Sequence, residues 1–128
     1  VRSLKILVID DDMWTRDLMK LLLEADNHEV DVAQTGTEGL TQFARQEYDL
    51  VMTDRAMPDM SGDQVAAAVK KVNPAMPVVL LTGFGDVMKD EGELPEGIDS
   101  ILSKPVTQDE LQHAIRSVID PQGPPSEP

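Results

Sequence analysis

The chain has 128 residues, 41% of them hydrophobic, no cysteine, and a formal net charge of -13 at pH 7. This length suits one domain with a single core, and so acidic a chain without a basic stripe is unsuited to direct nucleic-acid binding. Disulfides and thiolate chemistry are excluded, and no apolar run is long enough to cross a membrane. We expect a cytoplasmic domain over residues 1–120, followed by a disordered tail or linker over 121–128, where proline and polar residues dominate.

Five short apolar runs in the sequence predict β-strands. Continuous apolar runs are typical of strands that are covered on both faces, whereas strict alternation is typical of a half-exposed edge strand. Only the second run alternates, so we expect it at the edge of the sheet. The five predicted strands lie at residues 5–9, 28–33, 50–52, 78–81 and 98–102.

Segments with helical periodicity separate these runs and predict amphipathic helices. The first spans residues 13–25, and the second starts at Thr35. The third and the last begin with the capping-box sequences Ser61-Gly-Asp-Gln64 and Thr107-Gln-Asp-Glu110. Residues 84–97 are interrupted by glycine and proline, so we expect only one short, mobile helix there.

All four predicted helices carry apolar residues at helical spacing, including Leu40, Phe43 and Ala44 in the second and Leu111, Ile115 and Val118 in the last. Residues three or four positions apart share one face of a helix, so a repeated apolar spacing marks the buried side. The expected core-facing residues are Trp14, Leu18, Leu21, Leu22 and Ala25 in the first helix, and Val65, Val69 and Val72 in the third.

Strand and helix alternate five times along the chain, which predicts a doubly wound α/β domain with a five-stranded parallel sheet. In such sheets, the ligand site lies beyond the carboxyl ends of the strands, near the switch in strand order. The third strand ends in a loop, because Pro58 bars helix continuation there. The residues expected at the strand ends are Asp10 and Asp11, Asp54, Thr82 with Gly83, and Lys104.

These strand-end residues are suited to phosphoryl transfer. Three carboxylates at one edge raise each other's proton affinity unless a cation lies among them. Mg²⁺ suits such a set, since it binds a few carboxylates together with water and phosphate oxygens. With the metal present, Asp54 stays ionised and can attack phosphorus to give an aspartyl phosphate. The Lys104 ammonium and the Thr82 hydroxyl are then placed to neutralise the phosphoryl oxygens.

Four segments of the chain resemble the receiver domain of response regulators in two-component signalling. They are Ile-Leu-Val-Ile-Asp10-Asp11-Asp12, Asp-Leu-Val-Met-Thr-Asp54-Arg-Ala-Met-Pro58, Leu-Leu-Thr82-Gly83 and Ser-Lys104-Pro105. Their order and spacing match the family from residue 5 to about 119. The resemblance implies a flavodoxin-like (CheY-like) three-layer sandwich. Residues 81–86 also resemble receivers that end hybrid histidine kinases.

The resemblance further implies a role for each site residue. Asp54 would accept a phosphoryl group from a histidine kinase or a histidine phosphotransfer protein, and the domain would then switch conformation to signal. Asp10 and Asp11 would hold Mg²⁺ together with Asp54, and the backbone carbonyl of Ala56 would complete the coordination. The residues implied to bind the phosphoryl group are Thr82 and Lys104.

Ile101 departs from the family pattern, because receivers commonly have tyrosine or phenylalanine three residues before the lysine. We therefore expect a weaker or different conformational readout on the face of the fourth helix and fifth strand. The family's cis lysine–proline bond is carried over to Lys104–Pro105 as a hypothesis. Asp59 lies in the loop after Asp54 without motif support, and we expect it to be solvated.

Two other functions stay open on the sequence alone. A small Mg²⁺-dependent phosphatase of the haloacid-dehalogenase type would use Asp10 as nucleophile and Asp12 as acid/base. That family has threonine or valine where this chain has Trp14. A degenerate receiver would serve only as a docking module. The sequence identifies neither the kinase nor the output partner or domain.

Overall fold

The computed structural model describes residues 3–83 and 95–119, which form five strands and four helices; strand and helix alternate as far as β4, and β5 is the next described element. The expected helix over 84–97 falls mostly outside the described residues, as does the expected tail over 121–128. No described helix is both long and apolar enough to cross a bilayer. In chain order, the elements are β1 Lys5–Ile9, α1 Met13–Ala25, β2 Glu29–Ala33, α2 Gly36–Arg45, β3 Leu50–Asp54, α3 Gly62–Val72, β4 Val78–Thr82, β5 Ser100–Ser103 and α4 Gln108–Ile119.

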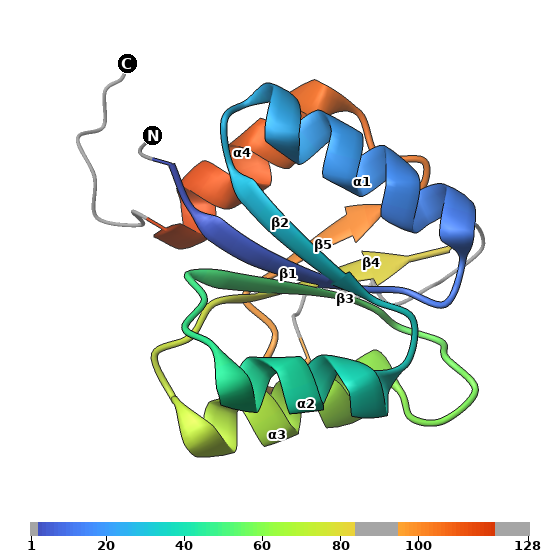
Figure 1. Cartoon of the computed structure of the whole chain (residues 1–128), viewed down its shortest axis with the longest axis vertical. Coiled ribbons are helices and arrows are strands. Elements are labelled where there is room, and N and C mark those ends of the chain that lie inside the picture. The colour runs from blue at the N-terminus through green and yellow to red at the C-terminus, as the bar shows by residue number, and fades with distance from the viewer. Residues whose placement is uncertain (1–2, 84–94, 120–128) are drawn as a thin grey trace.

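The five strands form one parallel sheet in the order β2-β1-β3-β4-β5. Helices α1 and α4 cover one face of this sheet, and α2 and α3 cover the other (Figure 1). This is the predicted doubly wound, flavodoxin-like sandwich, and β2 is the edge strand that its alternating sequence indicates. The chain leaves β1 in one direction and returns to β3 on its other side, so the switch point lies between these two strands.

The strand register brings the acidic residues to one level. The last paired residues of β1 and β3 are Ile9 and Thr53. Asp10 and Asp54 follow them directly, so both carboxylates emerge side by side at the carboxyl end of the sheet. The switch point and the acidic strand ends therefore coincide.

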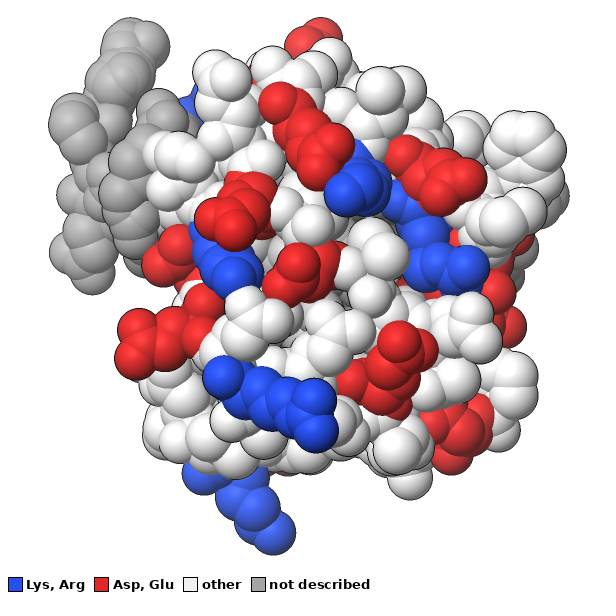
Figure 2. Space-filling model, viewed as in Figure 1, with Lys and Arg blue, Asp and Glu red and all other residues white. Residues whose placement is uncertain are grey.

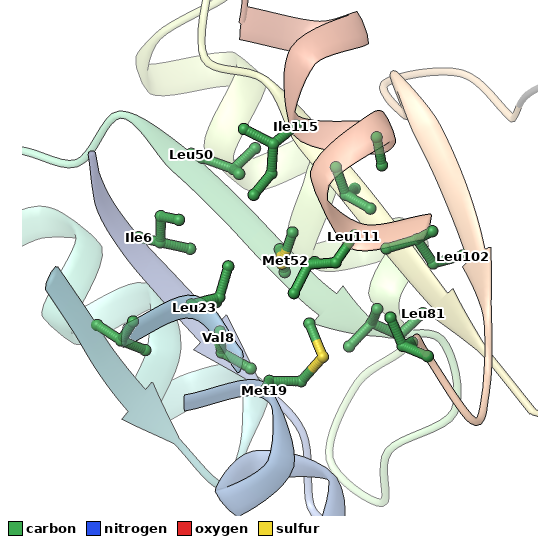
Figure 3. Packing of buried hydrophobic residues seen from close by; sticks show 14 of the residues in the cluster. Ile6, Val8, Met19, Leu23, Leu50, Met52, Leu81, Leu102, Leu111 and Ile115 are labelled. Carbon is green, nitrogen blue, oxygen red and sulfur yellow. The ribbon is translucent and has the colours of Figure 1, made fainter. Parts of the chain in front are cut away.

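Apolar side chains fill the space on both sides of the sheet. Figure 3 shows those between the sheet and helices α1 and α4, where the labelled side chains of β1, α1, β3, β4, β5 and α4 point toward one another. A second cluster lies between the sheet and helices α2 and α3. Burial of this kind contributes about 25 cal/mol per Å² of apolar surface, so the two clusters supply the main force that holds the strand ends in register. The labelled residues are Ile6, Val8, Met19, Leu23, Leu50, Met52, Leu81, Leu102, Leu111 and Ile115.

The predicted core stripe of α1 is wrong in its main members. Trp14 is 80% exposed and Leu21 is 66% exposed, whereas Met19 and Leu23 are fully buried. Apolar residues crowd this helix, so its sequence supports two adjacent stripes, and helical period alone does not choose between them. The stripe centred on Met19 packs on the sheet, which leaves a largely apolar face turned toward solvent.

The other helices follow their predicted boundaries closely. In α3, the Ser61 hydroxyl accepts from the Gln64 N–H, and the Gln64 side chain accepts from the Ser61 N–H, which confirms the predicted capping box. Val65 and Val69 are buried, but the prediction for Val72 is wrong, because this last residue of the helix is 73% exposed. The capping box predicted for the last helix, α4, is also present.

Candidate functional site

Asp54 ends the central strand β3 with its side chain nearly buried. Every residue of this strand is buried, because helices cover both faces of the sheet here. One carboxylate oxygen, Oδ1, accepts a hydrogen bond from Lys104 Nζ at 3.0 Å. A carboxylate out of water is stable only with partners of this kind. The structure therefore places Asp54 as a nearly buried carboxylate with one cationic partner.

Asp10 is fully buried beside it, at the end of β1. Its Oδ1 accepts from the Asp12 N–H at 2.8 Å, while its Oδ2 lies 2.9 Å from Lys104 Nζ without an aligned hydrogen bond. Asp11 is exposed at the same turn. One carboxylate oxygen from each of Asp10, Asp11 and Asp54 lies within 4.8 Å of the other two. The three acids thus converge as the sequence predicted.

Lys104 follows β5 and reaches into this acidic group. Its backbone N–H donates to the Thr82 carbonyl at 2.8 Å, which aligns the ends of β4 and β5. The Lys104–Pro105 bond is cis, as the family pattern implied. Although burial opposes the charged form, the neighbouring carboxylates of Asp10 and Asp54 raise the pKa of the Lys104 ammonium. The lysine is therefore held protonated between the two buried carboxylates.

The site carries more negative charge than Lys104 neutralises. Burial raises the pKa of Asp54 to about 6, against the lowering effect of Lys104, and the neighbouring Asp10 and Asp11 add to the rise. Burial likewise raises the pKa of Asp10. Three carboxylates face one ammonium, and a buried Asp10 oxygen has no aligned donor. A hard divalent cation with oxygen ligands fits this donor set, because it would relieve the repulsion among the acids.

Thr82 and Ala56 lie at the strand end and in the loop near the acidic group, but no contact with the three acids defines their roles among the hydrogen bonds described for them. Thr82 is fully buried at the end of β4, and its hydroxyl donates to the Leu102 carbonyl over a long 3.4 Å. Ala56 is exposed in the loop two residues after Asp54. The structure brings Asp10, Asp54 and Lys104 into direct contact. The phosphoryl-binding and metal-binding roles of Thr82 and Ala56 stay predictions.

Arg16 and Asp59 make contacts that the sequence analysis did not predict, Arg16 at the acidic turn and Asp59 at the start of α2. Arg16 Nη1 donates to the Asp10 backbone carbonyl at 2.8 Å and so ties α1 to the acidic turn. Asp59 is not merely solvated, since its carboxylate accepts three hydrogen bonds from Gly36 and Thr37 at the start of α2. The only feature of the sequence that could have indicated the contact of Arg16 is its position six residues after Asp10, the first acid. No feature of the sequence indicated the contacts of Asp59 with the start of α2.

An apolar groove of about 530 Å³ opens beside the acidic group. It runs between α1 and the segment that follows β5, and Lys104 belongs to both the groove and the site. The exposed apolar face of α1 continues from it. The main lining residues are Trp14, Leu18, Met19, Lys104, Pro105 and Val106.

The geometry of Asp12 bears on the phosphatase alternative. Its side chain caps α1 by accepting from the Thr15 hydroxyl at 2.8 Å and from the Thr15 N–H at 3.3 Å. These hydrogen bonds lower the pKa of Asp12. An acid/base that must give up a proton at neutral pH needs the opposite shift. The phosphatase arrangement is therefore not favoured by this site.

The family model of the response regulator receiver domain matches residues 6–116, and the chain belongs to this family. Phosphorylation on an aspartate and Mg²⁺ binding at an acidic pocket are general properties of receiver domains, which interact with histidine kinases or phosphotransfer proteins. The predicted family and fold are thus confirmed. Neither the phosphatase nor the docking-only alternative is favoured.

Curated relatives and solved structures agree with this family. The chain is 36% identical over 119 residues to the transcriptional regulatory protein GlrR of Escherichia coli K12, covering 93% of this chain and 27% of that protein. It is 32% identical to ZraR of the same organism, covering 91% and 26%. The chain thus spans about a quarter of the length of these relatives.

Among solved structures, a receiver domain protein from Clostridium thermocellum is 41% identical with a TM-score of 0.83, over 91% of this chain and 94% of that one. A CheY-like receiver domain protein from Methanospirillum hungatei is 30% identical with a TM-score of 0.83, over 94% and 97%. The likeness therefore covers nearly the whole of each of these two matched chains.

Proposed function

We propose that this receiver domain accepts a phosphoryl group on Asp54 from the phosphohistidine of a histidine kinase or histidine phosphotransfer protein. The observation that supports it most is the contact of Lys104 Nζ with Asp54 Oδ1 at 3.0 Å and Asp10 Oδ2 at 2.9 Å. In this proposal, Mg²⁺ is held by Asp10, Asp11 and Asp54 together with the Ala56 carbonyl. The proposed location is the cytoplasm, with which a chain free of cysteine is consistent.

Each residue has a distinct part in the proposed transfer. A carboxylate oxygen of Asp54 forms the new bond to phosphorus while the phosphorus–nitrogen bond of the donor breaks, and the leaving imidazole takes the electron pair and a proton. Asp10, Asp11 and Asp54 would hold Mg²⁺, which would supply positive charge for the phosphoryl oxygens and would keep Asp54 ionised. Lys104 offers a second cation to those oxygens. The Thr82 hydroxyl offers a donor once it leaves the Leu102 carbonyl.

The apolar groove beside Lys104 is the proposed binding site for the protein that donates the phosphoryl group. A protein donor must bring its phosphohistidine to Asp54 while its surface contacts the surroundings. Trp14, Leu18 and Leu21 offer an apolar strip on α1 that continues from the groove. On the face shown in Figure 2, acidic and basic side chains of the described residues are interspersed, without a continuous basic surface. An apolar face of the donor, rather than an acidic one, therefore suits this strip.

Ile101 bears on the signalling half of the proposal. The side chain is half-buried on β5 and packs against the core cluster of the α2–α3 side. An aliphatic residue here makes the readout of phosphorylation weaker or different from that of receivers with an aromatic ring. Amide exchange with and without a beryllofluoride phosphate mimic checks this, and large changes confined to the β5 surface would contradict it.

Mass spectrometry after incubation with acetyl phosphate and Mg²⁺ tests the phosphoacceptor. We expect one added phosphoryl group, mapped to the peptide that contains Asp54, and no adduct in Asp54→Asn. Asp17→Asn, which changes an exposed acid on α1, is the matched control and retains the adduct. An adduct that persists in Asp54→Asn and maps to Asp10 would overturn the proposal and favour phosphatase chemistry.

A further inference from the structure

The loop over residues 55–61 connects the phosphoacceptor strand to α3 and carries Ala56. Both of its ends are fastened next to Asp54. The Arg55 N–H donates to the Leu81 carbonyl at 2.9 Å, and the Gly62 N–H donates to the Arg55 carbonyl at 2.8 Å. A Cβ at Gly62 would lie 2.4 Å from the Asp54 carbonyl oxygen, so the loop closes as tightly as glycine allows. These contacts fasten only the two ends of the loop, at Arg55 and Gly62, and do not involve its middle.

Asp59 fastens the middle of the loop to α2. Its Oδ1 accepts from the Gly36 N–H at 3.0 Å, and its Oδ2 accepts from the Thr37 N–H and the Thr37 hydroxyl, both at 2.8 Å. The first N–H groups of a helix have no partner within the helix, and they attract negative charge. These hydrogen bonds, with the Thr37 N–H first, lower the pKa of Asp59 to about 2. The carboxylate is therefore ionised in this contact at any ordinary pH.

A packing contact reinforces this polar one. A Cβ built at Gly36 would lie 2.3 Å from Cγ of Met60, so the Met60 side chain occupies the space that the glycine leaves on α2. The residues joined in this way are more than twenty positions apart in the sequence. The loop thus rests directly on the first turn of α2 through two neighbouring residues.

Helix α2 does not depend on Asp59 for its own start. Thr35 already caps this helix, since its hydroxyl accepts from the Glu38 N–H at 3.0 Å. The helix also buries Phe43 and packs Gly39 against Ile9 of the core. The loop residues, in contrast, are exposed or half-buried. The helix is the fixed partner in this contact, and the loop is the part that it holds.

From this geometry, and resting on the proposed function, we infer that Asp59 is a positioning residue for the metal site. By fastening the middle of the loop to α2, it holds the Ala56 carbonyl where the proposed Mg²⁺ coordination needs it. A residue that orients a ligand in this way typically changes metal affinity by about 10-fold or more when it is removed. Removal of the Asp59 carboxylate should therefore lower Mg²⁺ affinity, and this effect should be larger than any effect that comes from a less stable α2.

Isothermal titration of the metal-free chain with MgCl₂ tests this inference, with phosphorylation by acetyl phosphate as a second readout. We expect Asp59→Ala to bind Mg²⁺ about 10-fold more weakly than the wild-type chain. Thr35→Ala is the matched control, because it removes a cap from the same helix without touching the loop. It should lower the melting temperature and leave Mg²⁺ affinity unchanged.

Gly36→Ala separates position from charge. Alanine favours the helix, but its Cβ pushes Met60 and the loop away, and no charge changes. We expect this variant to bind Mg²⁺ more weakly although the Asp59 charge is kept, and a melting curve measures the stability cost of moving Met60 and Val65. Wild-type Mg²⁺ affinity in Asp59→Ala, or an equal loss in Thr35→Ala, would overturn the inference while leaving the proposed function intact. A wild-type chain that binds no Mg²⁺ would overturn both together.

Discussion

The carboxyl end of the sheet and the outward face of α1 are neighbours, yet they depart from ordinary burial in opposite directions. At the sheet end, Asp10 is fully buried and Asp54 nearly so, although charged groups usually stay in water. On α1, Trp14 and Leu21 are exposed to 80% and 66%, although large apolar groups usually leave water. Neither departure helps the domain to fold.

The contrast separates two tasks within one small domain. Buried acids with raised proton affinity are suited to a reaction at one carboxylate oxygen, and the sheet register fixes the groups that surround them. An exposed apolar strip suits contact with another surface, and it needs no fixed partner within the chain. Departures from folding rules are expected where function requires them. Substitutions at the two regions should accordingly change different properties.

The largest effect is expected when Lys104 is replaced by methionine, which leaves Asp10 and Asp54 without their shared cation. Breaking a buried ion pair on one side typically costs about 3 kcal/mol or more. We expect the free energy of unfolding at neutral pH, measured with denaturant in EDTA, to fall by about that amount. Lys20→Met breaks the exposed pair with Glu24 (3.1 Å) and serves as control, with a change of about 0.5 kcal/mol or less. Equal effects of the two variants would contradict this interpretation of the site.

Asp54→Asn should stabilise the metal-free chain in a pH-dependent manner. Burial raises the folded pKa to about 6 from 3.8, so the folded state binds more protons than the unfolded state between these values. Stability therefore falls as pH rises from 4 to 6 in the wild-type chain, and the variant lacks this loss. Above pH 6, we expect the variant to be more stable by on the order of 2 kcal/mol.

Denaturation curves in EDTA at pH 4 and pH 7.5 measure this difference. The advantage of Asp54→Asn should nearly vanish at the lower pH, where the Asp54 carboxyl is protonated in the folded wild-type chain. An advantage of the same size at both pH values would assign the effect to packing rather than to charge.

The smallest expected effect on stability comes from Trp14→Ala on the outer face of α1. The indole contributes little to the core, so the free energy of unfolding should change by about 0.5 kcal/mol or less. Phosphotransfer from a phosphorylated histidine kinase should slow about 10-fold, since exposed aromatic residues commonly dominate docking. The rate with acetyl phosphate should stay unchanged, because that donor needs no docking surface.

Val72→Ala provides the matched control on the other side of the sheet. Val72 is 73% exposed on α3, away from the groove, and its replacement should leave both rates unchanged. A slower rate with acetyl phosphate in Trp14→Ala would show that the indole affects the chemical step. It would contradict the assignment of docking to the α1 face and of chemistry to the acidic site.

Most of the fold was predictable from the sequence because strands that are covered on both faces read as continuous apolar runs. The runs that end at Ile9 and at Met52 predicted the two central strands, and the parallel register of these strands brings Asp10 and Asp54 together. Capping sequences such as that at Ser61 located the helix starts. The convergence of the strand-end residues follows from topology alone.

The remaining features depend on information that local sequence patterns do not contain. In α1, Leu18, Met19 and Leu21 are all apolar, so packing against β1 and β2, rather than helical period, decides which stripe faces the sheet. Asp59 binds mainly backbone N–H groups of residues more than twenty positions earlier, and backbone donors leave no mark in a sequence. Contacts of that kind appear only when the chain is folded.

Trp14 is the only tryptophan of the chain, and it stands in water at the rim of the groove that includes Lys104. Its fluorescence is therefore a built-in optical signal from one known position, without an attached dye. An indole that becomes covered emits at shorter wavelength, while a nearby ion or phosphate changes its intensity. The same side chain could thus report arrival of a donor and occupation of the acidic site as two distinguishable spectral changes.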